Sequence, residues 1–240
     1  MPCPPRDHRS EVLEHYGRRW EEASAESLRA RPASRAEVLE AIAEALPSRR
    51  PLHVLDLGVG PATVPAHLLA GPRAGGLRVV GLDMTPSALA RGRELAASIG
   101  LGDRLDMLAG LMERLPFRDG AFDAAVSLLA LNLVDDKAGA LAEAERVVAP
   151  GGTVVIADCV RPGSAPCTRD AGHGAWARCL AGAPTLEGLR RLLGGAGLVP
   201  VREADMTATV RRLTGGGGGW DWPEFNEHGL GFVVMVLERP

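Results

Sequence analysis

Polar and apolar positions follow a helical period in the first part of the chain. Within 8–23, apolar side chains recur every three or four residues, which predicts an amphipathic helix. A second apolar stripe predicts a helix over 35–46, and Pro47 is expected to end it. Because both helices precede the first strand-like segment, we expect residues 1–48 to form an N-terminal helical lid.

After residue 50 the pattern changes to short apolar runs that alternate with helical segments. This alternation predicts an α/β fold with a doubly wound, mostly parallel sheet covered by helices on both faces. The last two extended segments have no predicted helix between them, so the second is expected to run antiparallel at one side of the sheet. Strands are predicted at 52–58, 78–83, 104–108, 122–129, 153–159, near 198–211 and at 230–238, and helices at 87–99, 137–148 and 185–195.

Composition narrows the class of protein. The 240 residues carry a net charge of −3, so the basic surface typical of a nucleic-acid binder is not expected. No apolar run reaches the roughly 18 residues that span a bilayer, and the N-terminus has no apolar signal-peptide region. The four cysteines are too scattered for a disulfide framework. We expect a cytoplasmic globular protein that contacts neither membranes nor nucleic acids.

The most informative segment is VLDLGVGPATVPAHLLA at 54–70, where a strand leads into a glycine-rich turn and then a helix. Gly58 and Gly60 allow close approach of a ligand to the backbone, and the helix start offers free N–H groups. A dinucleotide-binding turn would have glycine or alanine at position 63, where this chain has Thr63. The Asp56 carboxylate would also repel a pyrophosphate. It suits a ligand with a cationic amino-acid end.

Two further segments complete a predicted pocket. Asp83 lies at the tip of the next strand, where an acid accepts hydrogen bonds from ribose hydroxyls. The loop LAGLMERLPF at 108–117 places Met112 where it can lie against a purine ring. Each feature alone has a plainer interpretation as a turn or a helix cap. Their order along the chain predicts a pocket for an adenosine that carries an amino-acid tail.

At this point the chain resembles the class I S-adenosylmethionine-dependent methyltransferases. The resemblance covers about 50–160, with DLGVGPA, VVGLD, ERLPF, FDAAVS and RVVAPGG in the family's order. It implies a seven-stranded sheet, a methyltransferase domain over 49–240 with substrate-side insertions at about 159–184 and 211–229, and S-adenosylmethionine as cofactor with S-adenosylhomocysteine as product. The family often has glycine at position 62 and an acid at 111, where this chain has alanine and leucine. The cofactor-binding residues implied are Asp56, Gly58, Gly60, Ala62, Asp83, Met84, Leu111, Met112, Glu113 and Ser127.

A narrower resemblance points to the arsenite methyltransferases, through GLDMT, LNLVDDK and WARCLAGAPTLEGLRRLLGGAGL. In that family, two or three cysteine thiolates bind trivalent arsenic. Cys179 occupies one of these positions, whereas the other two are Pro65 and Leu129. Cys159 and Cys167 are alternative thiolates. The competing interpretation is that these cysteines are small buried apolar residues, and we favour it.

A general base is needed only if the acceptor loses a proton. Candidates at the expected pocket mouth are Tyr16 (beside His15), Asn132 and His173 (near Trp176), and Cys179 is a candidate under the arsenic hypothesis. No metal site is expected. Each residue also has a plainer role: Tyr16 as packing of the lid, Asn132 as a turn residue and His173 as a solvated loop residue. Trp220, Trp222 and Phe225, which follow the run of glycines at 215–219, are expected to close over an apolar acceptor or to anchor their loop.

The leading hypothesis is methyl transfer from S-adenosylmethionine to a small organic molecule. One alternative is an arsenite or methylarsenite methyltransferase that uses Cys159, Cys167 and Cys179. A second is a non-catalytic, methyltransferase-like binding module, against which the intact Asp56 and Asp83 argue. A nicotinamide-dependent oxidoreductase is disfavoured by Thr63. The acceptor and the oligomeric state stay open.

Overall fold

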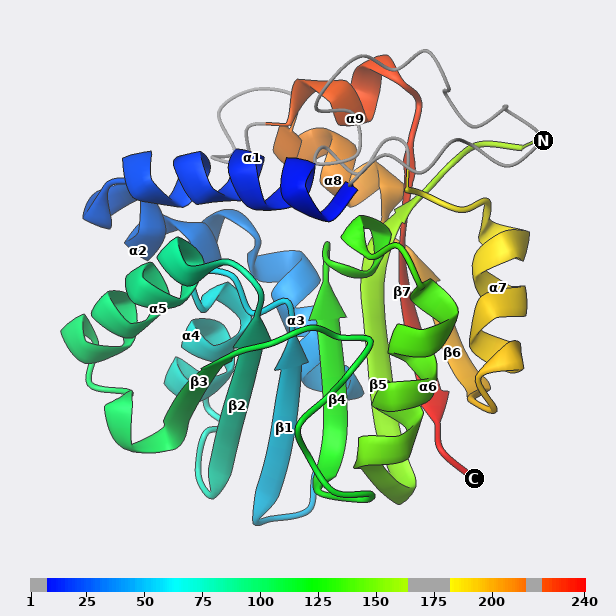
Figure 1. Cartoon of the computed structure of the whole chain (residues 1–240), viewed down its shortest axis with the longest axis horizontal. Helices are drawn as coiled ribbons and strands as arrows, with labels where there is room; N and C mark the ends of the chain where they lie inside the picture. Colours follow the sequence, from blue (N-terminus) through cyan, green and yellow to red (C-terminus); the bar gives the residue numbers. More distant parts are fainter. Residues whose placement is uncertain (1–7, 164–181, 215–221) are drawn as a thin grey trace.

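The computed structural model describes residues 8–163, 182–214 and 222–240, which surround one seven-stranded sheet (Figure 1). The strand order is β3-β2-β1-β4-β5-β7-β6. Strands β1 to β5 are parallel to one another, and β7 is antiparallel to both β5 and β6. This confirms the predicted seven-stranded, mostly parallel sheet. The strands are β1 (Leu52–Leu57), β2 (Leu77–Asp83), β3 (Leu105–Ala109), β4 (Phe122–Leu128), β5 (Val148–Val160), β6 (Val199–Asp205) and β7 (Gly231–Glu238).

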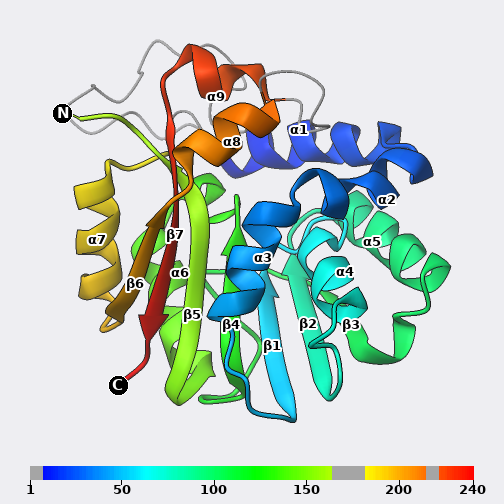
Figure 2. The ribbon, with the colours of Figure 1, turned by 180° about the vertical axis from the view of Figure 1, so that it is seen from behind.

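Helices cover both faces of the sheet, as Figures 1 and 2 show from opposite sides. On one face lie α3 (Ala36–Ala45), α4 (Thr63–Ala70) and α5 (Pro86–Ser98), and on the other lie α6 (Lys137–Val147) and α7 (Leu186–Gly195). Alternate residues of the central strands point to opposite faces. Val54 therefore joins the core beneath α3 and α4, and Leu55 joins the core beneath α6 and α7. Because these strands are buried on both sides, they are continuously apolar.

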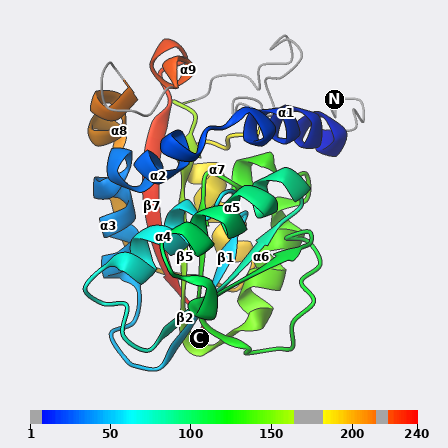
Figure 3. The same ribbon diagram turned by 90° about the vertical axis from the view of Figure 1, so that its left-hand side faces the viewer.

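Helix α1 (His8–Glu22) lies across the carboxyl ends of the parallel strands (Figure 3). Its second half is fixed to α5 by hydrogen bonds to main-chain carbonyls. Arg91 donates to Trp20 O at 3.1 Å and Glu21 O at 2.9 Å, and Ser87 Oγ donates to Gly17 O at 3.1 Å. Its first half contacts the loop after β3, where Arg9 forms an ion pair of 3.4 Å with Glu113.

The expected lid over 1–48 contains helices with two different roles. α2 (Ala25–Ser34), which the sequence pattern did not predict, follows α1 and begins at Ser24, whose side chain accepts a hydrogen bond from Ser27 N. α3 instead packs in the core through Val38 and Ile42, both of which have no exposed surface. The part of the segment that can cover a site is therefore α1 and α2.

The prediction for the C-terminal strands was partly wrong. Strand β6 ends at Asp205 rather than near 211, and α8 (Thr207–Thr214) and α9 (Pro223–Glu227) lie between β6 and β7. The Asp205 side chain accepts a hydrogen bond from Thr207 N at 2.8 Å, which turns the chain into α8. The expected antiparallel direction of the last strand is confirmed, but β7 lies inside the sheet and β6 forms its edge. Of the described helices, none is long and apolar enough to cross a membrane.

Candidate functional site

The turn after β1 brings main chain to the edge of the sheet in a conformation that favours glycine. Gly58 and Gly60 have φ values of +75° and +52°, and Ala62 also lies in the left-handed region at +62°. A Cβ atom on Gly58 would overlap that of Ala130 and lie 3.0 Å from Met112 Cε. The turn is therefore closely packed, and its position 58 accepts no side chain without displacement of its neighbours.

Asp56 lies one residue before the end of β1 and lines the cavity above the turn. Its side chain is 1% exposed, and its Oδ2 atom has no hydrogen-bond partner among the described residues. Burial, with a smaller contribution from the nearby Asp83 carboxylate, raises the pKa of Asp56 to about 8. A buried carboxylate oxygen of this kind is stabilised by a cationic donor.

Asp83 ends β2, beside the same turn. Its carboxylate accepts hydrogen bonds from Gly60 N and Thr85 N, both at 2.8 Å. Burial raises its pKa above the usual value, whereas these backbone hydrogen bonds act in the opposite direction. The two N–H groups orient the carboxylate at the cavity wall, where its remaining acceptor capacity suits a pair of hydroxyl groups.

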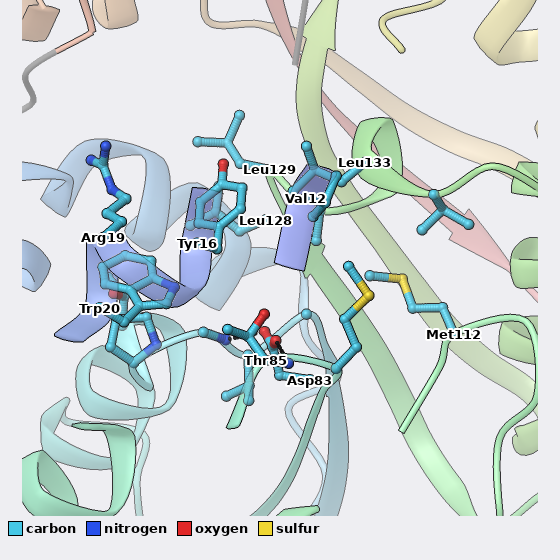
Figure 4. A pocket seen from close by; sticks show the side chains of 18 of the residues that line it. Val12, Tyr16, Arg19, Trp20, Asp83, Thr85, Met112, Leu128, Leu129 and Leu133 are labelled. Carbon is cyan, nitrogen blue, oxygen red and sulfur yellow. Dashed lines mark hydrogen bonds between the residues drawn. The ribbon is translucent and has the colours of Figure 1, made fainter. Parts of the chain in front are cut away.

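A cavity of about 430 Å³ lies between these strand ends and α1. Figure 4 shows Asp83 and Thr85 on one side of it and Val12 and Tyr16 of α1 on the other, with Met112 approaching from the loop after β3. The wall beyond the glycine turn is mainly apolar. Its side chains come from α1, the end of β4, the turn that follows and the start of α9, and they are Val12, Tyr16, Leu128, Leu129, Leu133 and Trp222.

Most of the residues expected to bind the cofactor line this cavity. They are Asp56, Gly58, Gly60, Asp83, Met84, Leu111, Met112 and Glu113. Ala62 and Ser127 are not among the lining residues. Ala62 precedes the first residue of α4 and closes the turn, accepting a hydrogen bond from Ala66 N at 2.9 Å. Ser127 is buried in β4, and its Oγ has no hydrogen-bond partner among the described residues.

The expected catalytic residues do not all lie at the cavity. Tyr16 and His15 line the cavity, whereas Asn132 does not. Asn132 is 1% exposed, and its Nδ2 donates to Asp158 Oδ1 and Cys159 O, both at 2.8 Å. The side-chain amide of Asn132 thus links its turn to β5 by hydrogen bonds. His173 and Cys179 lie outside the described residues, as do Trp176, Cys167 and Trp220.

The cysteine that the structure describes is not placed as an arsenic ligand at the cavity. Cys159 is fully buried, is not among the lining residues, and lies 3.1 Å from Asn132 Nδ2. Leu129, at one of the subfamily's cysteine positions, does line the cavity and has a φ of +56°. Among the described residues no group of three His, Cys, Asp or Glu side chains is arranged to hold a metal ion.

Sequence reasoning missed the cationic side of the cavity. Arg31 and Arg35, from the end of α2 and the start of α3, line it beside Trp20 and Thr63. The only local signal was a pair of arginines in a segment that has a single buried apolar residue, Leu28, and a proline within the helix. That pattern does not distinguish a site residue from a solvated one.

Comparisons with known proteins show which family the central part of the chain resembles. Residues 55–156 match the family model described as a methyltransferase domain. An arsenite methyltransferase of Halobacterium salinarum is 31% identical over 77% of this chain and 45% of its own length. A demethylmenaquinone methyltransferase of Thermus thermophilus is 39% identical over 48% of this chain and 50% of its own length. The chain thus spans about half the length of these relatives.

Solved structures share the fold. A geranyl diphosphate C-methyltransferase from Streptomyces coelicolor, in complex with geranyl diphosphate and S-adenosyl-L-homocysteine, superposes with a TM-score of 0.75 at 17% identity over the whole of both chains. The [4+2]-cyclase SpnF superposes with a TM-score of 0.72 at 21% identity, over 85% of this chain and 81% of its own. The family match identifies residues 55–156 as a methyltransferase domain, and the superpositions show that the chain has the fold of these solved structures.

Proposed function

We propose that this protein transfers a methyl group from S-adenosylmethionine to a small organic acceptor with an apolar body. The observation that carries the proposal is the unpartnered, buried oxygen of Asp56 at the glycine turn, one strand away from the oriented carboxylate of Asp83. A ligand with an ammonium group and a pair of hydroxyls would satisfy both carboxylates. S-adenosylmethionine has these groups, and solved structures with this fold hold its product.

The described residues fit that cofactor. Asp56 would hold the amino group, Gly58 and Gly60 would lie along the tail, and Asp83 would hold the ribose hydroxyls. Met112 and Leu111, in the loop after β3, would border the adenine. When bound, S-adenosylmethionine would supply an electrophilic methyl group on a sulfonium: the acceptor atom would bond to the methyl carbon while the bond from that carbon to sulfur breaks, and S-adenosylhomocysteine would be left as product.

The protein's part in such a reaction is orientation and exclusion of water, since the methyl donor is already activated by its charge. The apolar wall supplies both. Val12 and Tyr16 close the cavity from α1, and Leu129, Leu133 and Trp222 border it from the far side. An apolar acceptor would displace water from these side chains and present its nucleophilic atom toward the glycine turn. Two candidates to accept a proton from it, His15 and Tyr16, line the cavity from α1.

A mass-spectrometric assay of the purified protein tests the proposal. S-adenosylmethionine is offered with a panel of phenols, quinols and prenyl compounds, and separately with arsenite and a reducing thiol. Enzyme-dependent formation of S-adenosylhomocysteine together with a methylated organic product is the expected result. Methylated arsenic that is lost in Cys179→Ser would instead support the arsenite alternative.

A binding measurement distinguishes the non-catalytic binding module from the proposed methyltransferase. S-adenosylhomocysteine should raise the melting temperature, because a ligand that binds only the folded state stabilises it. A protein that binds this ligand but methylates none of the acceptors fits a binding module. A protein whose melting temperature does not change at saturating ligand contradicts the proposed cofactor.

A further inference from the structure

The loop between β3 and β4 borders the cavity at its start and helix α6 farther along. It runs back along the face of the sheet that α6 covers (Figure 1). Leu111 and Met112, near its start, line the cavity. Leu115 and Phe117, which follow, pack in the core beneath α6 instead. A change in how the loop lies on α6 would therefore also move the cavity wall.

One turn of α6 binds the main chain of this loop at several points. The Glu143 carboxylate accepts a hydrogen bond of 2.8 Å from Leu115 N. The Arg146 side chain donates to Leu115 O at 3.2 Å and to Phe117 O at 2.8 Å. The Arg146 carbonyl accepts a hydrogen bond of 3.0 Å from Gly120 N. The loop thus satisfies much of its main-chain hydrogen bonding on two residues of one helix.

These two side chains also orient each other. Arg146 Nε donates to Glu143 Oε1 at 2.7 Å, and its Nη2 donates to Glu143 Oε2 at 2.9 Å, which fixes the relative orientation of both groups. The hydrogen bonds between them lower the pKa of Glu143 and, with a further bond to Asp119, raise that of Arg146. Both shifts favour the charged forms. Loss of the Glu143 charge would remove the acceptor for Leu115 N and the group that aims Arg146 at the loop.

Met112 connects this network with the cavity. It is 8% exposed, and it belongs both to the core beneath α6 and to the cavity lining, where Figure 4 shows it. Neither Glu143 nor Arg146 lines the cavity. Any effect of this pair on a ligand must therefore pass through the position of the loop.

We propose that Glu143, paired with Arg146, is a positioning residue for the cofactor's base, an inference that rests on the proposed function. The pair contacts no part of the cofactor and instead holds Leu111 and Met112 at the distance where they border the base. A radial gap of about 0.5–1 Å forfeits a quarter to a half of a dispersion contact, so a small displacement of the loop weakens this part of the site. The carboxylates proposed for the ribose and the amino-acid end lie on β2 and β1, outside this network of hydrogen bonds. Loss of the pair should therefore weaken binding of the base alone.

Two ligands that differ in the base test this. Isothermal titration calorimetry compares S-adenosylhomocysteine with S-ribosylhomocysteine, in which a hydroxyl group replaces the base. The wild-type protein should bind S-adenosylhomocysteine about 10- to 100-fold more tightly, because the base buries apolar surface. In Glu143→Gln this ratio should fall by about 3- to 30-fold, the range for residues that act on a ligand without contact. The affinity for S-ribosylhomocysteine should stay nearly unchanged.

Glu145→Gln is the matched control. Glu145 lies on the same helix and pairs with Arg239 at 2.8 Å, and its side chain is 28% exposed, against 22% for Glu143. Its ion pair does not include the loop. The control should therefore keep the full ratio even where it lowers the melting temperature, which separates positioning of the loop from a loss of overall stability.

A measurement on the wild-type protein requires no variant to fold. Coupling between two binding events is reciprocal, so a loop position that favours the base must itself be stabilised by the base. The amide hydrogens of Leu115 and Gly120, which bind α6, should exchange more slowly with saturating S-adenosylhomocysteine than with saturating S-ribosylhomocysteine. Amide exchange followed by NMR measures both rates.

The inference is overturned if Glu143→Gln keeps the wild-type ratio, or if the two ligands slow exchange equally in the wild-type protein. It is also overturned if Glu143→Gln weakens both ligands by the same factor, since that result assigns the residue to the cavity as a whole. A wild-type protein that binds both ligands equally tightly contradicts it as well. If the wild-type protein binds neither ligand, the proposed function itself fails, so the two failures are distinguishable.

Discussion

Protonation of Asp56 should control how tightly the cofactor's product binds. With a pKa of about 8, Asp56 is about nine tenths protonated at pH 7 in the unliganded protein. A cationic amino group binds the carboxylate form and lowers this pKa, so binding at pH 7 must release up to roughly 0.9 proton. The affinity of S-adenosylhomocysteine should therefore increase with pH until pH reaches about 8. Between pH 6 and pH 7, ionisation of a group with this pKa predicts an increase of about ninefold.

Calorimetry measures both quantities directly. At pH 7, titrations in two buffers with different ionisation enthalpies give the number of protons released, and titrations at pH 6 and 7 give the change in affinity. The ligand's amino group stays largely protonated in this range. Asp56→Asn is the control, because the amide keeps the shape of the side chain and cannot ionise. It should bind S-adenosylhomocysteine more weakly, with little dependence on pH.

The same shift has a consequence for stability that can be checked without ligand. A folded-state pKa above the unfolded value means that the folded protein favours the protonated form, so the stability due to this group is lost as pH rises toward 8. Asp56→Asn should therefore melt above the wild type at pH 8.5, with a smaller difference at pH 5. Equal affinities at pH 6 and 7, enthalpies that do not depend on the buffer and parallel melting curves would refute the reasoning.

Further predictions concern the turn and the buried network. Gly58→Ala combines a left-handed φ with overlap at Ala130 and should cost about 2–5 kcal/mol, which lowers the melting temperature by roughly 5–15 °C. Gly100→Ala shares the left-handed φ but has open space around it, so it should cost only about 1–2 kcal/mol, whereas Gly17→Ala in α1 should be neutral or stabilising. Equal melting temperatures for the three variants would contradict this account. Asn132→Ala should cost about 2–4 kcal/mol in urea unfolding, because it removes donors to Asp158, while the affinity for S-adenosylhomocysteine changes less than threefold.

The part of the cavity that we propose for the cofactor was predictable from sequence because its residues are close together in the chain. Asp56, Gly58 and Gly60 lie within five positions, and Asp83 ends the neighbouring parallel strand. Parallel strands place their carboxyl ends at one edge of the sheet, so the order of the motifs already implies that these groups meet. Apolar runs buried on both faces similarly indicated the central strands.

Helices α2 and α8 were missed for different physical reasons. α2 buries only Leu28 and contains Pro32, so it has almost no apolar period, and its N-terminal cap supplies the local signal. α8 contains threonines and a valine, which favour strands when taken alone. Its helix is set by the hydrogen bond from Thr207 N to the Asp205 side chain and by Val210, which is fully buried in the core. In α8 burial of Val210 thus outweighs the local preference for a strand, whereas α2 depends on its cap.

The part of the cavity that we propose for the acceptor could not be predicted, because it is assembled from distant segments. Val12, Leu129, Leu133 and Trp222 meet only after α1 has crossed the sheet and α9 has packed beside it. Leu129 also adopts a left-handed conformation that nothing in its sequence neighbourhood requires. Since the neighbouring segments can change without affecting the glycine turn, a family can keep one cofactor and vary its acceptors. The motif therefore identifies the chemistry, whereas the acceptor has to be argued from the apolar wall.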